Sequence, residues 1–490
     1  MKRFLPIFVL ILGLFIVSCK KDNAKPDTQN LDKEILLRDS TYFYSILFSL
    51  WTDKLPQPAE KNGKLDLKAY TEDFDKAEDV LEALMAKTQY DRFSFIDREG
   101  TVSEEIGDGI HKETGAIPIF LSTDGTTATA SLYVRFVQKN SPAEKAGLLR
   151  GMQILSINGN KNVGYLQDQA NKFELYNKFF TGETLSIQVK HPETGATSTL
   201  SVTGNAYQLN PIQNTKVIDR DGKKIGYISY SSFVAVTKRD GTANDYYSEM
   251  VNTFAELQNQ NIEELVIDLR YNGGGSTETA ELMSNLLVPT AYAKAKMYDY
   301  KVNAYLTEWG WNDNNDPNAP FKSVNFDKKN TLNLKRVYFL VTQSSASASE
   351  LVINVLKPYM DVQIISTNNL GSYGKPVGFF GYPVVDEYAD LYITSFQMVN
   401  KDGFGDYFNG LSGTKKNSID TFSKQLGDET EGMLADALYH IVNGTYRSAQ
   451  GSASYRKSTS YRGVTLESIE HQPETPNVKG LYKFAPIRVN

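Results

Sequence analysis

The stretch Ser345-Ala346-Ser347-Ala348-Ser349-Glu350 lies at a junction between two predicted elements. It follows the apolar run 337–341, which has the length and composition of a buried strand. It precedes residues 351–356, where apolar side chains recur at helical spacing. In such a strand–turn–helix junction, the free N–H groups and positive dipole end of the helix stabilise negative charge. The hexapeptide is therefore a candidate position for a nucleophilic serine.

The hexapeptide also has an ordinary structural interpretation. Ser347 and Glu350 have the spacing of a capping box, in which the two side chains satisfy free N–H groups at the start of a helix. Most serines in such boxes only cap, so the hexapeptide alone leaves both interpretations open.

A serine nucleophile needs a base, and histidine is scarce in this chain. The four histidines lie outside the segments that have the features of a catalytic core: His111, His191, His440 and His471. Lysine is the known substitute, and Lys375 lies in the glycine-containing turn 371–376 after the apolar run 362–365. A lysine acts as a base only when its amine is neutral, and burial favours the neutral form. A solvated loop lysine is the competing interpretation.

Three glycines follow another apolar run. Residues 266–269 lead into Gly273, Gly274 and Gly275, and a helical pattern follows over 277–287. Glycines at a strand end permit backbone conformations in which N–H groups approach a ligand closely. A phosphate loop is excluded, because no Gly-Lys-Ser/Thr follows and no G-x-G-x-x-G is present. The turn is therefore either an oxyanion hole or a plain strand-to-helix connection.

The segment 141–159 predicts a short helix, a glycine turn, a strand and an Asn-Gly turn. It resembles the core of a PDZ domain. Together, and in this order, four segments resemble the C-terminal processing peptidases, also called tail-specific proteases. They are the PDZ-like segment, a strand with D-L-R-x-N-x-G-G, the S-A-S-A-S-E turn and a glycine–lysine turn. The resemblance covers roughly residues 40 to 445.

The resemblance implies a role for each motif. Ser347 would be the nucleophile and Lys375 the general base of a Ser-Lys dyad. The oxyanion hole would be formed by the amide of Ala348 and by the pair Gly274 and Gly275, with Gly274 preferred. The implied reaction is hydrolysis of peptide bonds in proteins or peptides, and it needs no cofactor and no metal.

Recognition of substrate C-termini would belong to the PDZ-like module. Such a module adds the peptide as a strand and binds its carboxylate with loop amides. The candidate binding residues are Ala116, Ile117 and Ile119. Pro118 has no N–H, so the set of donors in this loop is incomplete.

The chain departs from the family pattern near the lysine. Phe379 stands where many members carry a glutamine that orients the amine, and the gap between Ser347 and Lys375 is longer than usual. Gln397, in the apolar run 391–399, is a candidate orienting residue in its place. These departures keep a second hypothesis open, a non-catalytic peptide-binding lipoprotein on a protease-like scaffold.

The N-terminus has the pattern of a lipoprotein signal. A basic start precedes the apolar run 4–17, which is shorter than the about 20 residues of a spanning helix. Cys19, the only cysteine, would carry the lipid after a signal peptide over 1–18, with a tether over 19–32. We expect a bacterial envelope lipoprotein of the outer membrane, attached through this lipid alone.

The rest of the chain predicts a multidomain α/β protein. The expected parts are a helical N-terminal domain (33–107), a β-rich PDZ-like domain (108–205) and an α/β serine protease core (206–445). Residues 292–330 within the core are expected to be a surface insertion, and residues 446–490 have no assigned role. A net charge of −6 argues against a nucleic-acid partner and leaves proteins or peptides as the expected substrates.

Overall fold

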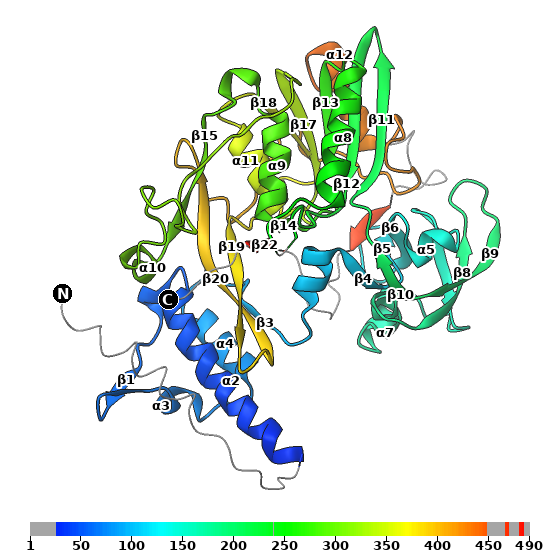
Figure 1. The fold of residues 1–490 in the computed structure, drawn as a ribbon. Coiled ribbons are helices and arrows are strands. Elements are labelled where there is room, and N and C mark those ends of the chain that lie inside the picture. Colours follow the sequence, from blue (N-terminus) through cyan, green and yellow to red (C-terminus); the bar gives the residue numbers. More distant parts are fainter. Residues whose placement is uncertain (1–25, 239, 448–465, 470–479, 485–490) are drawn as a thin grey trace. The chain divides into compact units, whose positions relative to one another are not determined.

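The computed structural model describes residues 26–238, 240–447, 466–469 and 480–484 (Figure 1). The predicted signal peptide and Cys19 lie outside these residues. The chain divides into two compact units. Unit 1 comprises Met1–Gly100, Val302–Gly310 and Phe380–Phe396, and unit 2 comprises Thr101–Lys301, Trp311–Phe379 and Gln397–Asn490. No helix in the described ranges is long and apolar enough to cross a membrane.

Unit 1 contains the expected N-terminal helices. Helix α2 (Pro26–Phe48) packs against α4 (Ala77–Met85), and their apolar cluster contains Tyr42, Ile46, Leu55, Val80 and Leu84. Helix α2 begins at Pro26, within the stretch 19–32 that was expected to be a tether. The proline at the first helical position explains the start, because its missing N–H needs no acceptor there.

Unit 1 also contains strands that the helical prediction did not include. Strand β1 (Ala59–Lys61) forms a hairpin with β2 (Lys64–Asp66), and β3 (Phe95–Asp97) pairs antiparallel with β20 (Ala389–Asn400). A one-turn helix, α3 (Lys68–Thr71), and helix α10 (Ala304–Glu308) complete the unit.

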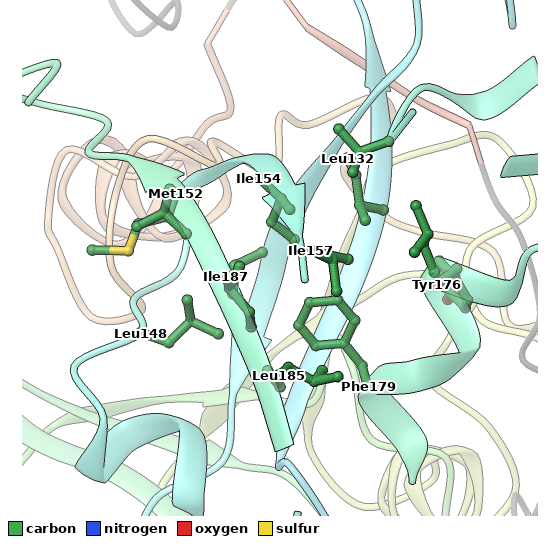
Figure 2. Packing of buried hydrophobic residues seen from close by; sticks show 14 of the residues in the cluster. Leu132, Leu148, Met152, Ile154, Ile157, Tyr176, Phe179, Leu185 and Ile187 are labelled. Atoms are coloured by element: carbon green, nitrogen blue, oxygen red, sulfur yellow. The ribbon is translucent and has the colours of Figure 1, made fainter. Parts of the chain in front are cut away.

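The first part of unit 2 is a β-rich module with its own apolar core (Figure 2). Strand β8 shows why the module folds: Leu185, Ile187 and Val189 are buried and alternate with more exposed residues, as in a half-buried strand. The strands of its sheet are β21 (Glu467–Ile469), β5 (Ala116–Ser122), β6 (Ser131–Val137), β7 (Gln153–Ile157), β8 (Thr184–Lys190) and β9 (Thr197–Thr203), in this order. Short helices α5 (Pro142–Lys145), α6 (Tyr165–Gln169) and α7 (Glu174–Asn177) and a β4–β10 pair (Ile110–Glu113, Asn205–Gln208) complete it.

The second part of unit 2 is an α/β core. Its sheet contains four parallel strands in the order β12 (Lys223–Tyr230), β13 (Glu264–Asp268), β17 (Arg336–Val341) and β18 (Asp361–Ser366). Strand β11 (Ile212–Arg220) pairs antiparallel with β12 at one edge. Helix α12 (Gly432–Asn443) packs on one face of this sheet. Helices α8 (Asp245–Asn259), α9 (Thr277–Leu287) and α11 (Ala348–Leu356) pack against one another (Figure 1). Ligands of open parallel sheets bind at the carboxyl ends of the strands, and three of the sequence motifs follow β13, β17 and β18.

A second sheet contains residues from late in the chain. Its order is β14 (Gly275–Ser276), β22 (Leu481–Tyr482), β19 (Val377–Val384), β20, β15 (Lys296–Val302) and β16 (Val324–Asn325). The segment 292–330 therefore contributes two strands to this sheet and is not only a surface insertion. Residues 446–490, which had no assigned role, contribute β21 to the module and β22 to this sheet.

Candidate active site

The structure brings the three motifs of the core together. The amide of Ala346 donates to the carbonyl of Asn272 (3.1 Å), so the serine turn lies against the glycine turn. The amide of Tyr373 donates to the carbonyl of Ser345 (2.9 Å), so the lysine turn lies against the serine turn. The three segments therefore meet beyond the carboxyl ends of the parallel strands that precede them.

Ser347 has an unusual backbone and a hydroxyl without a partner. It precedes helix α11 with φ 64° and ψ −106°, a region that non-glycine residues rarely adopt. Its side chain is completely buried, and Oγ has no hydrogen-bond partner among the described residues. Residues held in such conformations are concentrated at functional sites.

Only half of the predicted capping box is formed. The amide of Ser347 donates to Oε2 of Glu350 (2.7 Å), but the hydroxyl of Ser347 caps no N–H group. A role as a plain helix cap therefore does not explain the side chain of Ser347, and its hydroxyl remains a candidate nucleophile.

Glu350 connects the serine turn to the lysine turn. Its Oε2 accepts from the amides of Ser347 (2.7 Å) and Lys375 (2.8 Å), and its Oε1 accepts from the amide of Gly374 (2.7 Å) and the hydroxyl of Ser372. Burial raises the pKa of the Glu350 carboxyl, and these four hydrogen bonds act in the opposite direction. The sequence analysis recognised Glu350 only as a capping residue and missed this bridging role.

Lys375 is buried, with only 3% of its surface exposed, so the interpretation as a solvated loop lysine is wrong. Its Nζ lies 4.3 Å from the ring centroid of Phe379, the residue that replaces the family's glutamine. Desolvation disfavours an ammonium, whereas the face of an aromatic ring stabilises it. The backbone of Lys375 is fixed through Glu350.

Gln397, the candidate orienting residue, donates two hydrogen bonds through its amide nitrogen. Its Nε2 donates to the carbonyl of Gly405 and to Oδ1 of Asp406, both at 3.0 Å. An orienting role for Gln397 stays a prediction.

The glycine turn presents a different N–H group from the one preferred on sequence. The amide of Gly274 is engaged within the turn by Oδ1 of Asn272 (2.9 Å). The amide of Gly275 instead donates to the carbonyl of Gly480 (2.6 Å). Both glycines have positive φ, 110° and 138°, which L side chains rarely adopt. Both glycines stay candidate donors, and the amide of Gly275 is the one that already meets a main-chain carbonyl.

Ala348 has the position expected of a second donor. It is the first residue of α11, where helical geometry leaves N–H groups without an acceptor within the helix. An ideal Cβ built on Gly274 would lie 3.0 Å from Cβ of Ser347, so the glycine turn directly adjoins the serine.

A buried ionic network holds the glycine turn in place. Arg270, which is 1% exposed, donates to Asp268 (2.9 Å), Asp420 (2.7 Å) and Glu431 (2.9 Å). Burial alone would raise the pKa of Asp420, but Arg150 and Arg270 hold it at about 2. The D-L-R part of the motif is explained by this network, since a buried arginine is tolerated only when fully paired.

The candidate peptide-binding residues of the module all lie on β5. Ala116 and Ile119 are buried and Ile117 is partly buried. One edge of β5 pairs with β6, and β21 occupies the other edge.

Comparisons with known proteins agree with this geometry. Residues 224–409 match the model of peptidase family S41. The chain is 28% identical over 233 residues to a carboxyl-terminal-processing protease of Picosynechococcus sp. (strain ATCC 27264 / PCC 7002 / PR-6), which covers 47% of this chain and 48% of that protein. It is 25% identical over 375 residues to the carboxy-terminal processing protease CtpB of Bacillus subtilis (strain 168), covering 74% of this chain and 68% of that protein.

A solved structure shares the fold. It is an S41 protease candidate from Bacteroides fragilis NCTC 9343, with a TM-score of 0.62, 24% identity and coverage of 87% of this chain and 100% of that one. Residues 224–409 are therefore similar to peptidase family S41, and this solved structure shares the fold of the chain. The resemblance to the C-terminal processing peptidases, drawn from four short motifs, is confirmed.

Proposed function

We propose that this chain is a serine endopeptidase in which Ser347 is the nucleophile and Lys375 the general base. The observation that carries the proposal is the buried, unpartnered hydroxyl of Ser347 on a strained backbone. The bridge through Glu350 to the backbone of Lys375 supports it, because that bridge fixes the two residues against each other.

The mechanism follows from these positions. Oγ of Ser347 forms a bond to the peptide carbonyl carbon while neutral Lys375 accepts its proton. The negative oxygen is stabilised by the amides of Gly275 and Ala348, and one such donor contributes about 2.7–4 kcal/mol. Lys375 then gives the proton to the leaving amine as the C–N bond breaks. Water, deprotonated by Lys375, finally hydrolyses the acyl-serine.

Activity measurements on variants of the dyad test the proposal. Ser347→Ala and Lys375→Met should each reduce kcat/KM by at least about 10³-fold, and the double variant should lose no more, because the two residues act as a unit. Lys375→Arg should fail as well, since arginine stays protonated. Lys401→Met, at an exposed lysine paired with Asp402, is the matched control. Wild-type turnover in either Lys375 variant would exclude a lysine base.

A non-catalytic peptide-binding protein is the second candidate function. Phe379 in place of the family's glutamine favours it, because the aromatic face stabilises the charged lysine rather than the neutral base. Binding of peptides without cleavage, equal in wild type and Ser347→Ala, would support this alternative.

We further propose that the β-rich module recognises substrate C-termini in the manner of a PDZ domain. The support is β5, which is preceded by Gly115 and whose edge opposite β6 accepts an added strand, since β21 pairs there. Amidation of a substrate's C-terminus should raise KM, since charge-assisted hydrogen bonds are roughly twice as strong as neutral ones. Equal kcat/KM for amidated and free-acid substrates would contradict this role.

Membrane attachment through lipid on Cys19 also stays a proposal, because Cys19 lies outside the described residues. Cys19→Ala should abolish lipid labelling and move the protein to the soluble fraction. Mass spectrometry of the mature N-terminus is the direct test, and an unmodified cysteine would exclude the lipid anchor.

A further inference from the structure

The candidate oxyanion donor is already occupied by the chain itself. The carbonyl of Gly480 accepts the hydrogen bond of the Gly275 amide at 2.6 Å. An ideal Cβ on Gly274 would collide with this carbonyl oxygen and would also lie 3.0 Å from Cβ of Ser347. The Gly480 carbonyl thus lies beside the glycine turn and the serine, where a substrate carbonyl is expected.

The residues after Gly480 are held along their backbone like a bound peptide. Leu481 and Tyr482 pair in parallel with Gly275 and Ser276 of β14, and Tyr482 also pairs with Phe379 of β19. The amide of Lys483 then donates to the carbonyl of Phe379 (2.9 Å). Main-chain pairing of this kind binds peptides, and side-chain pockets add specificity.

Two of these side chains fill apolar space. Leu481 and Tyr482 are each only 1% exposed, and the ring of Tyr482 lies 5.7 Å from that of Phe379. At about 25 cal/mol per Å² of apolar surface, burial of an aromatic and an aliphatic side chain favours binding strongly.

Lys483 enters a polar pocket built from tyrosines and an acid. Its Nζ donates to the hydroxyl of Tyr300 (3.4 Å), which lies 3.1 Å from the hydroxyl of Tyr298, and Tyr298 donates to Oε1 of Glu281 (2.5 Å). Burial raises the pKa of the Glu281 carboxyl, and the charge of Lys483 opposes this rise. The pocket therefore suits a cationic side chain, because a cation relieves the cost of burying Glu281.

The path continues past Lys483 into a cavity of about 1230 Å³ to which Phe484 contributes. Its described lining includes five acidic residues and one lysine, Lys238. The acidic residues are Asp108, Asp240, Asp245, Glu249 and Glu278. This lining extends the preference for positive charge beyond the Lys483 pocket.

A second stretch of the same C-terminal segment occupies the module. Glu467, Ser468 and Ile469 pair antiparallel with β5 at Ser122, Leu121 and Phe120. Ile469 packs against the module's apolar core, and Leu466 packs against the cluster of Ile119, Leu121 and Tyr133. The edge of β5 on which a substrate strand would add is thus paired with the chain's own residues.

We propose that the strand edges beside Ser347 form a series of subsites for a peptide of the pattern small–apolar–aromatic–basic, and that Gly480 to Lys483 occupy them in cis. The proposal rests on the proposed function, since it treats the Gly275 amide as the oxyanion donor. A substrate must displace residues 480–483 to reach Ser347, and it gains the same contacts when it carries the same pattern.

The chain order supports competition over productive binding. A substrate whose C-terminus binds the module is cleaved on the N-terminal side of that contact. Here the stretch on the module, 467–469, precedes the stretch at the serine, 480–483. A substrate bound at its C-terminus would have the opposite order, with the stretch at the serine before the stretch on the module. The C-terminal segment therefore does not imitate one bound substrate but competes with substrate at each position.

Peptide binding to full-length variants tests the subsites. The probe is a fluorescent peptide Val-Lys-Gly-Leu-Tyr-Lys-Phe-Ala, and a second probe carries Glu in place of the lysine that follows tyrosine. Anisotropy is measured with Ser347→Ala alone and combined with Lys483→Met, which weakens the segment bound in cis. The combination with Lys401→Met is the matched control.

We expect Lys483→Met to tighten binding of the lysine probe at least about fivefold, because less competitor must be displaced. Lys401→Met should change nothing, and the glutamate probe should bind at least about tenfold more weakly than the lysine probe. In the active chain, Lys483→Met should lower KM and leave kcat unchanged. If Lys483→Met fails to fold, Gly480→Ala replaces it, since its methyl carbon would lie 2.6 Å from the Tyr482 ring.

The outcomes separate the two proposals. Equal binding by all variants, together with no discrimination between the probes, overturns the subsites even if the chain cleaves other peptides. Binding with the expected preferences, but no cleavage of any peptide by any variant, overturns the proposed function and upholds the subsites.

Discussion

At the scale of single residues, Glu350 shows how one carboxylate can hold two turns of the candidate active site together. Its two oxygens accept four hydrogen bonds from the serine and lysine turns. It is fully buried, so each of these donors would be costly to leave unpaired. Ser347 and Lys375 are far apart in the sequence, and the side chain of Glu350 connects their backbones.

Replacing Glu350 tests this role. In Glu350→Gln, one acceptor oxygen becomes an NH2 group that faces two N–H or O–H donors. We expect a loss of roughly 2–4 kcal/mol of unfolding free energy from the unpaired donors, and a fall in kcat/KM because Ser347 and Lys375 lose their common support. Chemical denaturation and peptide cleavage measure the two effects. Glu308→Gln, at an exposed glutamate, is the control. Unchanged stability and activity would show that the bridge has no energetic role.

At the scale of secondary-structure elements, the sequence predicted the parts that are built from long patterns. The apolar runs before the glycine, serine and lysine motifs are the strands β13, β17 and β18. These strands are neighbours in one sheet, so the turns that follow them, with Ser347 and Lys375, lie close together. The choice between Gly274 and Gly275 depends on contacts such as the one that the Asn272 side chain makes with the Gly274 amide, and no local pattern encodes the position of that side chain. Strands β21 and β22 have only three and two residues, so they carry no periodicity and exist through pairing alone.

One element should give the molecule a measurable dependence of stability on pH. Burial raises the pKa of Glu113, on β4, to about 7, although its side chain remains 20% exposed. The folded state then binds the proton of the Glu113 carboxyl more tightly than the unfolded chain does. The contribution of this group to the free energy of unfolding is therefore fully present below the ordinary glutamate pKa. It is lost as pH rises through about 7.

We therefore expect Glu113→Gln to gain stability relative to wild type as pH rises from about 5 to 8, by roughly 1–3 kcal/mol. His111, near Glu113, acts in the opposite direction, since burial lowers its pKa to about 4. Subtracting the variant's unfolding curve from that of wild type at each pH isolates Glu113. A difference that is constant across this range would contradict the raised pKa.

At the scale of the whole molecule, one C-terminal segment contributes to both sheets of unit 2 that carry proposed peptide sites. Its described stretches, 466–469 and 480–484, pair with β5 and with β14 and β19. Sequence reasoning missed this because a strand added at an edge depends on the partner's free N–H and C=O groups rather than on its own composition. Regulation by displacement of the segment is the consequence of this arrangement.

Displacement at the module can be separated from displacement at the serine. Ile469→Lys places a charge where the isoleucine packs against the module's apolar core, so β21 should leave β5. Full burial of an aliphatic side chain contributes about 1.5–3 kcal/mol, and Ile469 is partly buried, so the loss of a fraction of this energy should lower KM several-fold for long substrates with a free C-terminal carboxylate. Short peptides that reach only the serine should keep their KM. Leu36→Lys, at an exposed leucine, controls for the added charge. An equal fall in KM for short and long substrates would mean that β21 does not compete at the module but instead loosens the segment beside Ser347.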